Sequence, residues 1–201
     1  MKISLGKKAV LLILLVLLID QSLKFWIKTH YSLGHSTEIF HWFRILFTEN
    51  NGMAFGMEFG GQTGKLILSI FRIVAIFGIG WYLAHLIRTK VHSGFVLCIA
   101  LILAGAIGNL IDSAFYGIFF TGSEYQIAQF LPSGGGYASF LHGRVVDMLY
   151  FPIIQGHFPS WFPIWGSDQF IFFRPVFNIA DSSITIGVVI ILLFQKTFFK
   201  N

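Results

Sequence analysis

The sequence predicts an all-α membrane protein with four transmembrane helices, a small β cradle on the outer face and a long insert on that same face. Three observations lead to this prediction. Only 11% of the 201 residues are charged, and the mean hydropathy is +0.74, whereas about a quarter of the residues of a soluble chain are charged. Four apolar runs are each long enough to cross about 30 Å of hydrocarbon as a helix. Two polar, aromatic-rich connections separate these runs. We expect one membrane-embedded domain over residues 1–201.

The four spans are expected as long apolar runs with few charges. They cover residues 9–28, 66–87, 94–111 and 179–195. The first run continues through Asp20 and Lys24 with no small-residue cleavage site, so we expect it to be retained rather than removed as a signal peptide. The single cysteine, Cys98, lies inside the third run and excludes an internal disulfide framework.

The basic residues are concentrated on one side of the predicted bundle. Four spans put both termini on one side, and that side carries Lys2, Lys7, Lys8, Arg88, Lys90, Lys196 and Lys200. All nine acidic residues fall on the opposite side or in the outer halves of helices. The positive-inside rule therefore puts the termini in the cytoplasm and the acids at the outer face. The basic residues flank apolar runs and form no patch, so nucleic acid is not an expected partner.

The two outer connections differ in composition. Residues 38–59 are rich in β-forming residues around Asn50-Asn51-Gly52, a strong turn signal, so we expect a small hairpin or cradle there. Residues 113–176 contain a glycine-rich run from Ser133 to Gly136, followed by an aromatic and proline-rich stretch. Trp161 and Trp165 of that stretch suit the headgroup layer. An equal alternative is that these aromatic residues form the core of a small extramembrane subdomain.

Three aspartates are expected at helix mouths on the outer side. Asp112 closes the third span, Asp147 follows the long insert, and Asp181 opens the fourth span. Asn109 and Asn178 each precede an aspartate by three residues, so each shares a helix face with it. At the helix ends that carry Asp112 and Asp181, these residues can also have a purely structural role. Asn178 would be an N-cap with Asp181 in the first turn, and Asp112 would brace the end of its helix.

Two further polar positions lie inside the spans. Asp20 and Lys24 are four residues apart with the acid first, the favoured order for an ion pair, and a structural role is the simpler interpretation. Arg72 lies about two turns into the second span. It can extend toward the interface or pair with an outer acid, and the sequence does not decide between them.

The motifs narrow the possible chemistry. The sequence has no H-E-x-x-H, no G-x-S-x-G and no histidine pair at metal-ligand spacing, so no metal site is expected. Paired carboxylates remain. Two aspartates held close share one proton, so that one can activate a water while the other acts as an acid. A transporter or channel with an outer-face carboxylate relay is the alternative function, and a non-catalytic scaffold is the third.

Five motifs in order resemble the lipoprotein signal peptidases (signal peptidase II), which are aspartic peptidases of the bacterial cytoplasmic (inner) membrane. They are "DQSLK" (20–24), "NNGMAFG" (50–56), "GNLID" (108–112), "VVDM" (145–148) and "FNIADSSI" (177–184). The resemblance implies that Asp147 and Asp181 are the catalytic dyad. The positions that it implies as shaping or supporting the site are Asp20, Lys24, Asn51, Gly52, Asn109, Asp112, Asn178 and Ala180.

The resemblance also implies a substrate, a prolipoprotein whose cysteine already carries diacylglycerol. Cleavage would occur on the amino side of that cysteine, with no metal or cofactor. We expect a monomer in contact with membrane lipids, with its active site at the outer face.

The sequence departs from the family pattern in three places. Ser113 stands where the family commonly has arginine, Met53 replaces a small residue, and residues 113–144 replace a short turn. Arg144 is a candidate to replace the missing arginine. Because the insert contains a glycine-rich hinge and leads into Asp147, we expect it to be a lid or rim over the substrate groove.

Overall fold

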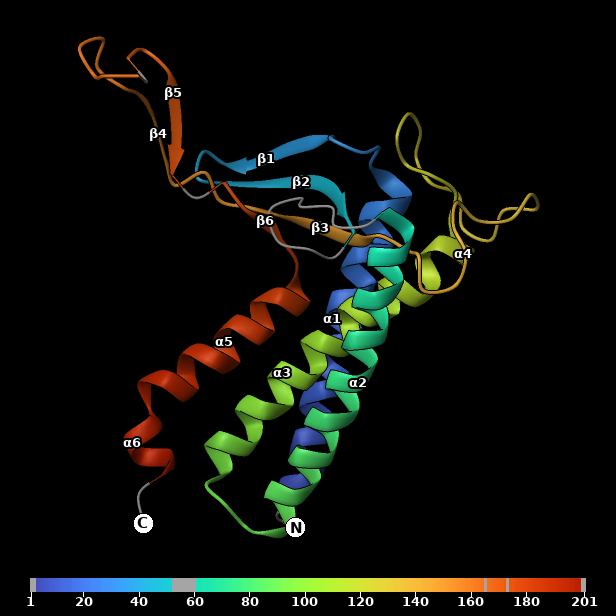
Figure 1. Ribbon diagram of the computed structural model, residues 1–201, viewed down its shortest axis with the longest axis vertical. Coiled ribbons are helices and arrows are strands. Elements are labelled where there is room, and N and C mark those ends of the chain that lie inside the picture. The colour runs from blue at the N-terminus through green and yellow to red at the C-terminus, as the bar shows by residue number, and fades with distance from the viewer. Residues whose placement is uncertain (1–2, 52–60, 165, 173, 200–201) are drawn as a thin grey trace.

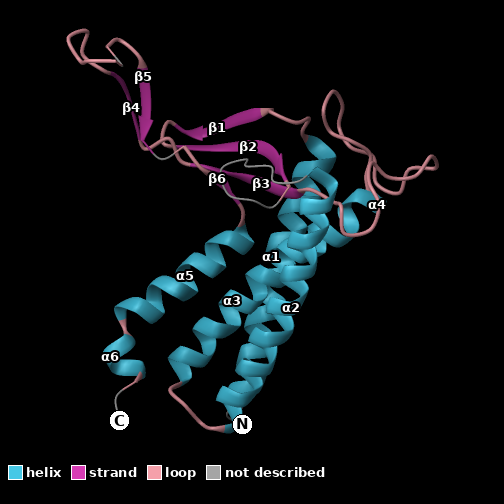
Figure 2. Cartoon of the chain, viewed as in Figure 1, coloured by secondary structure: helices cyan, strands magenta, loops and turns pink. Residues whose placement is uncertain are grey.

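The computed structural model describes residues 3–51, 61–164, 166–172 and 174–199 (Figure 1). Gly52, Met53 and Trp165, which the sequence singles out, lie outside the described residues. The molecule is mostly helical, with a small antiparallel sheet at one end of the helices (Figure 2). The expected combination of apolar helices with a small cradle of strands is therefore present.

Three helices are long and apolar enough to cross a membrane. They are α1 (Leu5–His30), α2 (Gly61–Arg88) and α3 (Ser93–Ile111), and α3 continues through a π-helical turn and α4 (Gly117–Phe119). These helices contain the first three expected spans. Large apolar side chains are exposed along them, among them Leu18 on α1 and Phe77 on α2, as expected for surfaces that contact lipid.

The helix at the position of the predicted fourth span is shorter than the sequence predicts. Helix α5 (Ile179–Leu193) has 15 residues, about 22 Å at 1.5 Å per residue, which is less than the hydrocarbon thickness of about 30 Å. A short helix, α6 (Gln195–Phe198), follows it. Helix α5 packs against α3 so closely that a Cβ on Gly105 would overlap the carbonyl oxygen of Ala180. Glycine at position 105 therefore brings the start of α5 next to α3.

The main sheet has the strand order β1-β2-β3-β6, with each neighbouring pair antiparallel. Its strands are β1 (Ser36–Phe40), β2 (Phe43–Asn50), β3 (Val145–Tyr150) and β6 (Val176–Phe177). The expected hairpin exists, but its turn lies at His41–Trp42 rather than at Asn50-Asn51-Gly52, because β2 stays paired with β3 as far as Asn50. A second hairpin joins β4 (Ile154–His157) to β5 (Gln169–Phe172).

The insert, residues 113–144, packs onto the sheet and the end of α1. Tyr116, Phe120 and Ala128 of the insert form one buried cluster with Phe47 of β2 and Met148 of β3. The end of α3, the start of α5 and strands β2 and β3 therefore meet at one level of the molecule. The connection between α2 and α3 lies at the opposite end of the helices, as does α6 (Figure 1).

Candidate active site

Asp147 lies in the middle of β3, where the pairing of β2 with β3 puts it opposite Thr48. Its side chain is buried, with 3% of its surface exposed. Two side-chain amides donate to its two oxygens. Asn178 Nδ2 contacts Oδ1 at 2.7 Å, and Asn50 Nδ2 donates to Oδ2. The carboxyl group is therefore held in one orientation by residues from β2 and from the start of α5.

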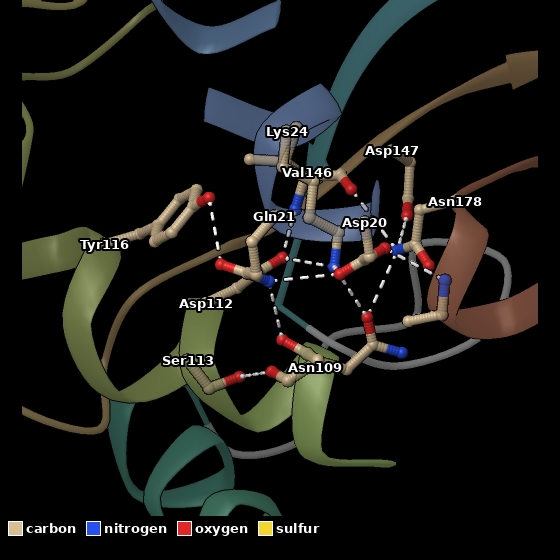
Figure 3. A network of polar contacts seen from close by, with 12 residues as sticks. Asp20, Gln21, Lys24, Asn109, Asp112, Ser113, Tyr116, Val146, Asp147 and Asn178 are labelled. Carbon is tan, nitrogen blue, oxygen red and sulfur yellow. Dashed lines mark hydrogen bonds and ion pairs between the residues drawn. The ribbon is translucent and has the colours of Figure 1, made fainter. Parts of the chain in front are cut away.

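Asp181 lies in the first turn of α5, and its position is fixed by two asparagines. Asn178 is the N-cap, and its Oδ1 accepts from the backbone nitrogen of Asp181 at 2.8 Å, which confirms the capping interpretation. Asn109 Nδ2, on α3, donates to Asp181 Oδ1 at 2.7 Å. Asn178 Nδ2 also donates to Asn109 Oδ1 at 3.1 Å. A continuous chain of amides thus connects Asp147 to Asp181, part of which Figure 3 shows.

The two carboxylates influence each other electrostatically. Burial raises the pKa of Asp147 to about 8, and the negative charge of Asp181 raises it in the same direction. The charge of Lys24 and the hydrogen bond from Asn178 act in the opposite direction and are smaller than the effect of burial. At neutral pH Asp147 therefore holds a proton next to a second carboxyl group, the condition for acid and base roles in one pair.

A buried lysine holds together the elements that carry the pair. Lys24 Nζ lies 2.9 Å from Asp20 Oδ2 and 2.8 Å from Asp112 Oδ2, so the expected pair with Asp20 forms, with Asp112 as a second partner. It also donates to Asn109 Oδ1 at 3.1 Å. Asp20 Oδ1 accepts from the backbone nitrogen of Ala180 at 2.9 Å. One ammonium thus links α1 to α3 and, through Asp20, to the first residues of α5.

Asp112 connects the end of α3 to β3, the strand that carries Asp147. Its Oδ2 accepts from the backbone nitrogen of Val146, next to Asp147, at 3.1 Å. One residue on, the carbonyl oxygen of Ser113 accepts from the backbone nitrogen of Gly143 at 2.8 Å. The two ends of the insert are therefore joined at its base, and Asp112 acts as the brace that the structural alternative describes.

Sequence reasoning missed three polar side chains in this region. Gln21 Nε2 donates to Asp20 Oδ2 at 3.0 Å and to Asp112 Oδ1 at 2.9 Å, and its Oε1 accepts from Tyr116 at 3.2 Å (Figure 3). Asn50 and Lys65 were also missed. Gln21 lies within "DQSLK" and Asn50 within "NNGMAFG", so both motifs pointed to the region. Lys65 precedes the expected second span and carries no such signal.

The cations near Ser113 come from α2. Arg72 Nη1 and Lys65 Nζ donate to Ser113 Oγ at 3.0 and 3.2 Å. The charge of Arg72 interacts with the charges of Asp181, Asp112 and Asp147. The candidate replacement for the family arginine, Arg144, contacts Glu49 at 3.3 Å and also pairs with Glu124.

Of the supporting positions implied by the resemblance, Asn51 contributes its backbone. Its carbonyl oxygen accepts from Lys65 Nζ at 2.9 Å. Among the residues that the structure describes, no group of three His, Cys, Asp or Glu side chains is placed to hold a metal ion.

Comparisons with known proteins find similar chains. The profile of the family described as Signal peptidase (SPase) II matches residues 12–198. A lipoprotein signal peptidase of Porphyromonas gingivalis is 54% identical over 189 residues, which are 94% of this chain and 82% of the relative. One of Amoebophilus asiaticus is 38% identical over 187 residues, 91% of this chain and 75% of the relative. A bacterial membrane enzyme solved by the in meso method at 2.3 Å resolution is 28% identical, with a TM-score of 0.56, and the match covers 96% of this chain and 92% of that one.

Proposed function

Because the chain belongs to the signal peptidase II family, we propose that Asp147 and Asp181 are the aspartates with which it hydrolyses a peptide bond. Family membership makes the chain an aspartic peptidase of lipoprotein maturation in the bacterial inner membrane, and it does not favour the transporter alternative. The observation that supports the assignment is the chain of amides through Asn178 and Asn109 that joins the two carboxyl groups.

The proposed mechanism gives the two aspartates different roles. Asp181, ionised, takes a proton from a water as the water oxygen attacks the carbonyl carbon of the scissile bond. Asp147, protonated because its pKa is raised to about 8, gives its proton to the carbonyl oxygen. The tetrahedral intermediate then collapses. Its C–N bond breaks, the amine leaves with the proton held by Asp181, and a hydroxyl of the intermediate returns a proton to Asp147.

The proposed substrate is a prolipoprotein that carries diacylglycerol on a cysteine, cut on the amino side of that cysteine. Two observations support it. The relatives at 54% and 38% identity are named lipoprotein signal peptidases. The proposed pair lies where the sheet meets the apolar helices, a level at which a lipid-anchored peptide bond can reach it.

We propose four membrane crossings, with α5 and α6 forming the fourth, both termini in the cytoplasm and the active site at the outer face. The distribution of basic residues supports this topology, as does the position of α6 and of the α2–α3 connection opposite the sheet. Cysteine labelling in intact cells tests it. A cysteine at Ser133 should react with an impermeant reagent, and one at Lys90 should react only after lysis. The reverse pattern would invert the topology.

The decisive experiment for the activity uses purified protein in detergent micelles and a peptide with a diacylglyceryl cysteine. Mass spectrometry should find a single cut on the amino side of the cysteine, in the presence and absence of a chelator. The same peptide without the lipid is the control and should be cut much more slowly. Equal cleavage of both peptides, or a cut elsewhere, would contradict the proposed substrate. We also propose that the protein acts as a monomer among membrane lipids.

A further inference from the structure

A polar cavity of about 510 Å³ lies next to the proposed catalytic pair. Asn50, which donates to Asp147, forms part of its lining, so the cavity begins where the pair is held. The rest of the lining comes from the end of β2 and the residue after it, from the start of α2 and from the end of the insert, with Glu49, Lys65, Tyr137 and Arg144 among its residues.

Lys65 is the unusual group in this lining. Its side chain is buried, with 6% of the residue exposed. Its ammonium donates to two neutral oxygens, the carbonyl of Asn51 and the hydroxyl of Ser113. Over the described part of the chain no carboxylate lies within ion-pair distance of it. The carboxylate whose charge acts on it is Asp112, which Lys24 already holds.

The other charges in the lining are paired with one another. Arg144 contacts Glu49 and Glu124, and Glu49 also pairs with Lys28. An ammonium has three N–H donors, and Lys65 uses two. A buried charge without a charged partner is costly, so a ligand that brings a carboxylate gains by binding here. The ligand that fits this cavity is therefore anionic.

We propose that the cavity binds acidic residues that follow the lipidated cysteine of the substrate, with Lys65 as their partner. This inference rests on the proposed function. The acyl chains and the apolar signal segment belong in hydrocarbon, so a polar cavity at the level of the sheet suits the chain beyond the scissile bond. An extended peptide advances about 3.3–3.6 Å per residue, so the residues concerned are the first few after the cysteine. The insert, which contributes Tyr137 and Arg144, thereby takes part in substrate selection.

The test compares two lipidated peptides that differ only after the cysteine. One carries aspartates at the second to fourth positions, counting the cysteine as the first, and the other carries asparagines. The quantity measured is the ratio of their kcat/KM values. We expect the protein to prefer the aspartate peptide about tenfold or more, since a hydrogen bond to a charged group contributes about that much.

Three variants make the test specific. Lys65→Gln should reduce the ratio to about one, whatever its effect on the rate itself. Lys65→Arg should keep most of the preference because it keeps the charge, which also guards against a variant that merely folds poorly. Arg44→Gln is the matched control, since Arg44 lies on β2 in an ion pair with Glu38 and is not part of the cavity lining. Its ratio should equal that of the unaltered chain.

Four outcomes would overturn a proposal. If the unaltered chain cuts both peptides equally at the cysteine, the cavity proposal fails and the proposed function stands. If it cuts neither, the proposed function itself fails. A preference that survives Lys65→Gln would place the acidic site elsewhere. The last outcome is a rate that falls equally for both peptides in Lys65→Gln and that depends on anionic rather than zwitterionic phospholipid in the vesicles. That result would assign the cavity to a lipid headgroup instead.

Discussion

The side-chain nitrogen of Asn178 donates to Asp147 Oδ1 at 2.7 Å, while its side-chain oxygen caps the helix that carries Asp181. One residue therefore fixes both members of the proposed pair. The strand that holds Asp147 and the helix that holds Asp181 cannot shift against each other without breaking one of these two bonds.

The first prediction concerns the pair itself. Asp147→Asn and Asp181→Asn should each lower kcat by about 10⁴-fold or more, and the double variant should be hardly slower, because members of one catalytic unit are not additive. The measurement is turnover of a lipidated peptide. Asp168→Asn is the control, because Asp168 is an exposed carboxylate directly before β5, at the end of the connection from β4. Appreciable activity in either single variant would contradict the assignment.

The pH profile should follow the proton on Asp147. The pKa of this carboxyl is raised from 3.8 to about 8, chiefly by burial. Because the proposed acid must be protonated, kcat/KM should fall as the pH rises through about 8. The sign for stability is the same. Between pH 4 and 8 the folded chain keeps a proton that the unfolded chain releases, so stability decreases as the pH rises. In Asp147→Asn the dependence of Tm on pH over this window should be shallower. An unchanged slope would mean that Asp147 does not hold this proton.

The buried lysine should matter more than either of its acids. Lys24→Met leaves Asp20 and Asp112 buried without their cation, and should cost about 3–5 kcal/mol. Asp20→Asn leaves Lys24 paired with Asp112, and should cost about 1–2 kcal/mol. Thermal unfolding in detergent measures both. Arg44→Met, which breaks a partly exposed pair on the sheet, is the control and should change stability little. Equal losses for Lys24→Met and Asp20→Asn would refute the bridging role.

Arg72 should supply the positive charge that the family commonly has at the position of Ser113. Arg72→Gln should lower kcat/KM about tenfold, because it removes a cation whose charge acts on all three outer aspartates. Arg72→Lys should lose less. Adding Ser113→Arg to Arg72→Gln should restore part of the activity, since it returns a guanidinium to the point where Arg72 now ends. If neither Arg72→Lys nor the added Ser113→Arg keeps or restores activity, the role of Arg72 is in packing rather than in charge.

The lid prediction for the insert needs a choice among its glycines. A Cβ on Gly136 would overlap the carbonyl oxygens of Gly117 and Ile118, and Gly135 has a φ of +86°, so alanine at either site distorts the loop. Gly134 has open space around its Cβ position. Gly134→Ala should therefore only stiffen the backbone, and should change kcat and KM together if opening is part of the cycle. If kcat and KM are both unchanged in Gly134→Ala, this segment does not open during the catalytic cycle.

Local sequence signals predicted the parts of this site that depend on one element. The ion pair of Asp20 with Lys24 and the cap of Asn178 on α5 follow from spacing along a single helix, and both are present. The three long spans follow from length and hydropathy. The turn of the first hairpin was misplaced because the Asn-Gly signal at 51–52 is local, whereas the pairing of β2 with the distant β3 decides where the strand ends.

Contacts between distant elements could not be predicted in the same way. Asn50 and Asp147 are 97 residues apart, and Gln21 and Asp112 are 91 apart. Their contacts exist only once the helices pack and the sheet forms. Lys65 was missed for the same reason, because a lysine beside an apolar run is ordinarily an interfacial residue, and only the folded chain shows it buried in a cavity.

The two hydrogen bonds at the base of the insert have a consequence for how such a chain can diversify. Asp112 binds the nitrogen of Val146, and Ser113 binds that of Gly143, so the strand bearing Asp147 is anchored independently of what lies between. Sequence can be lengthened, shortened or exchanged within the loop while Asp147 keeps its position. With the role in substrate selection proposed for the insert, evolution can alter which precursors are accepted without rebuilding the proposed pair, and a loop transplanted from a relative onto these two anchors should carry its selectivity with it.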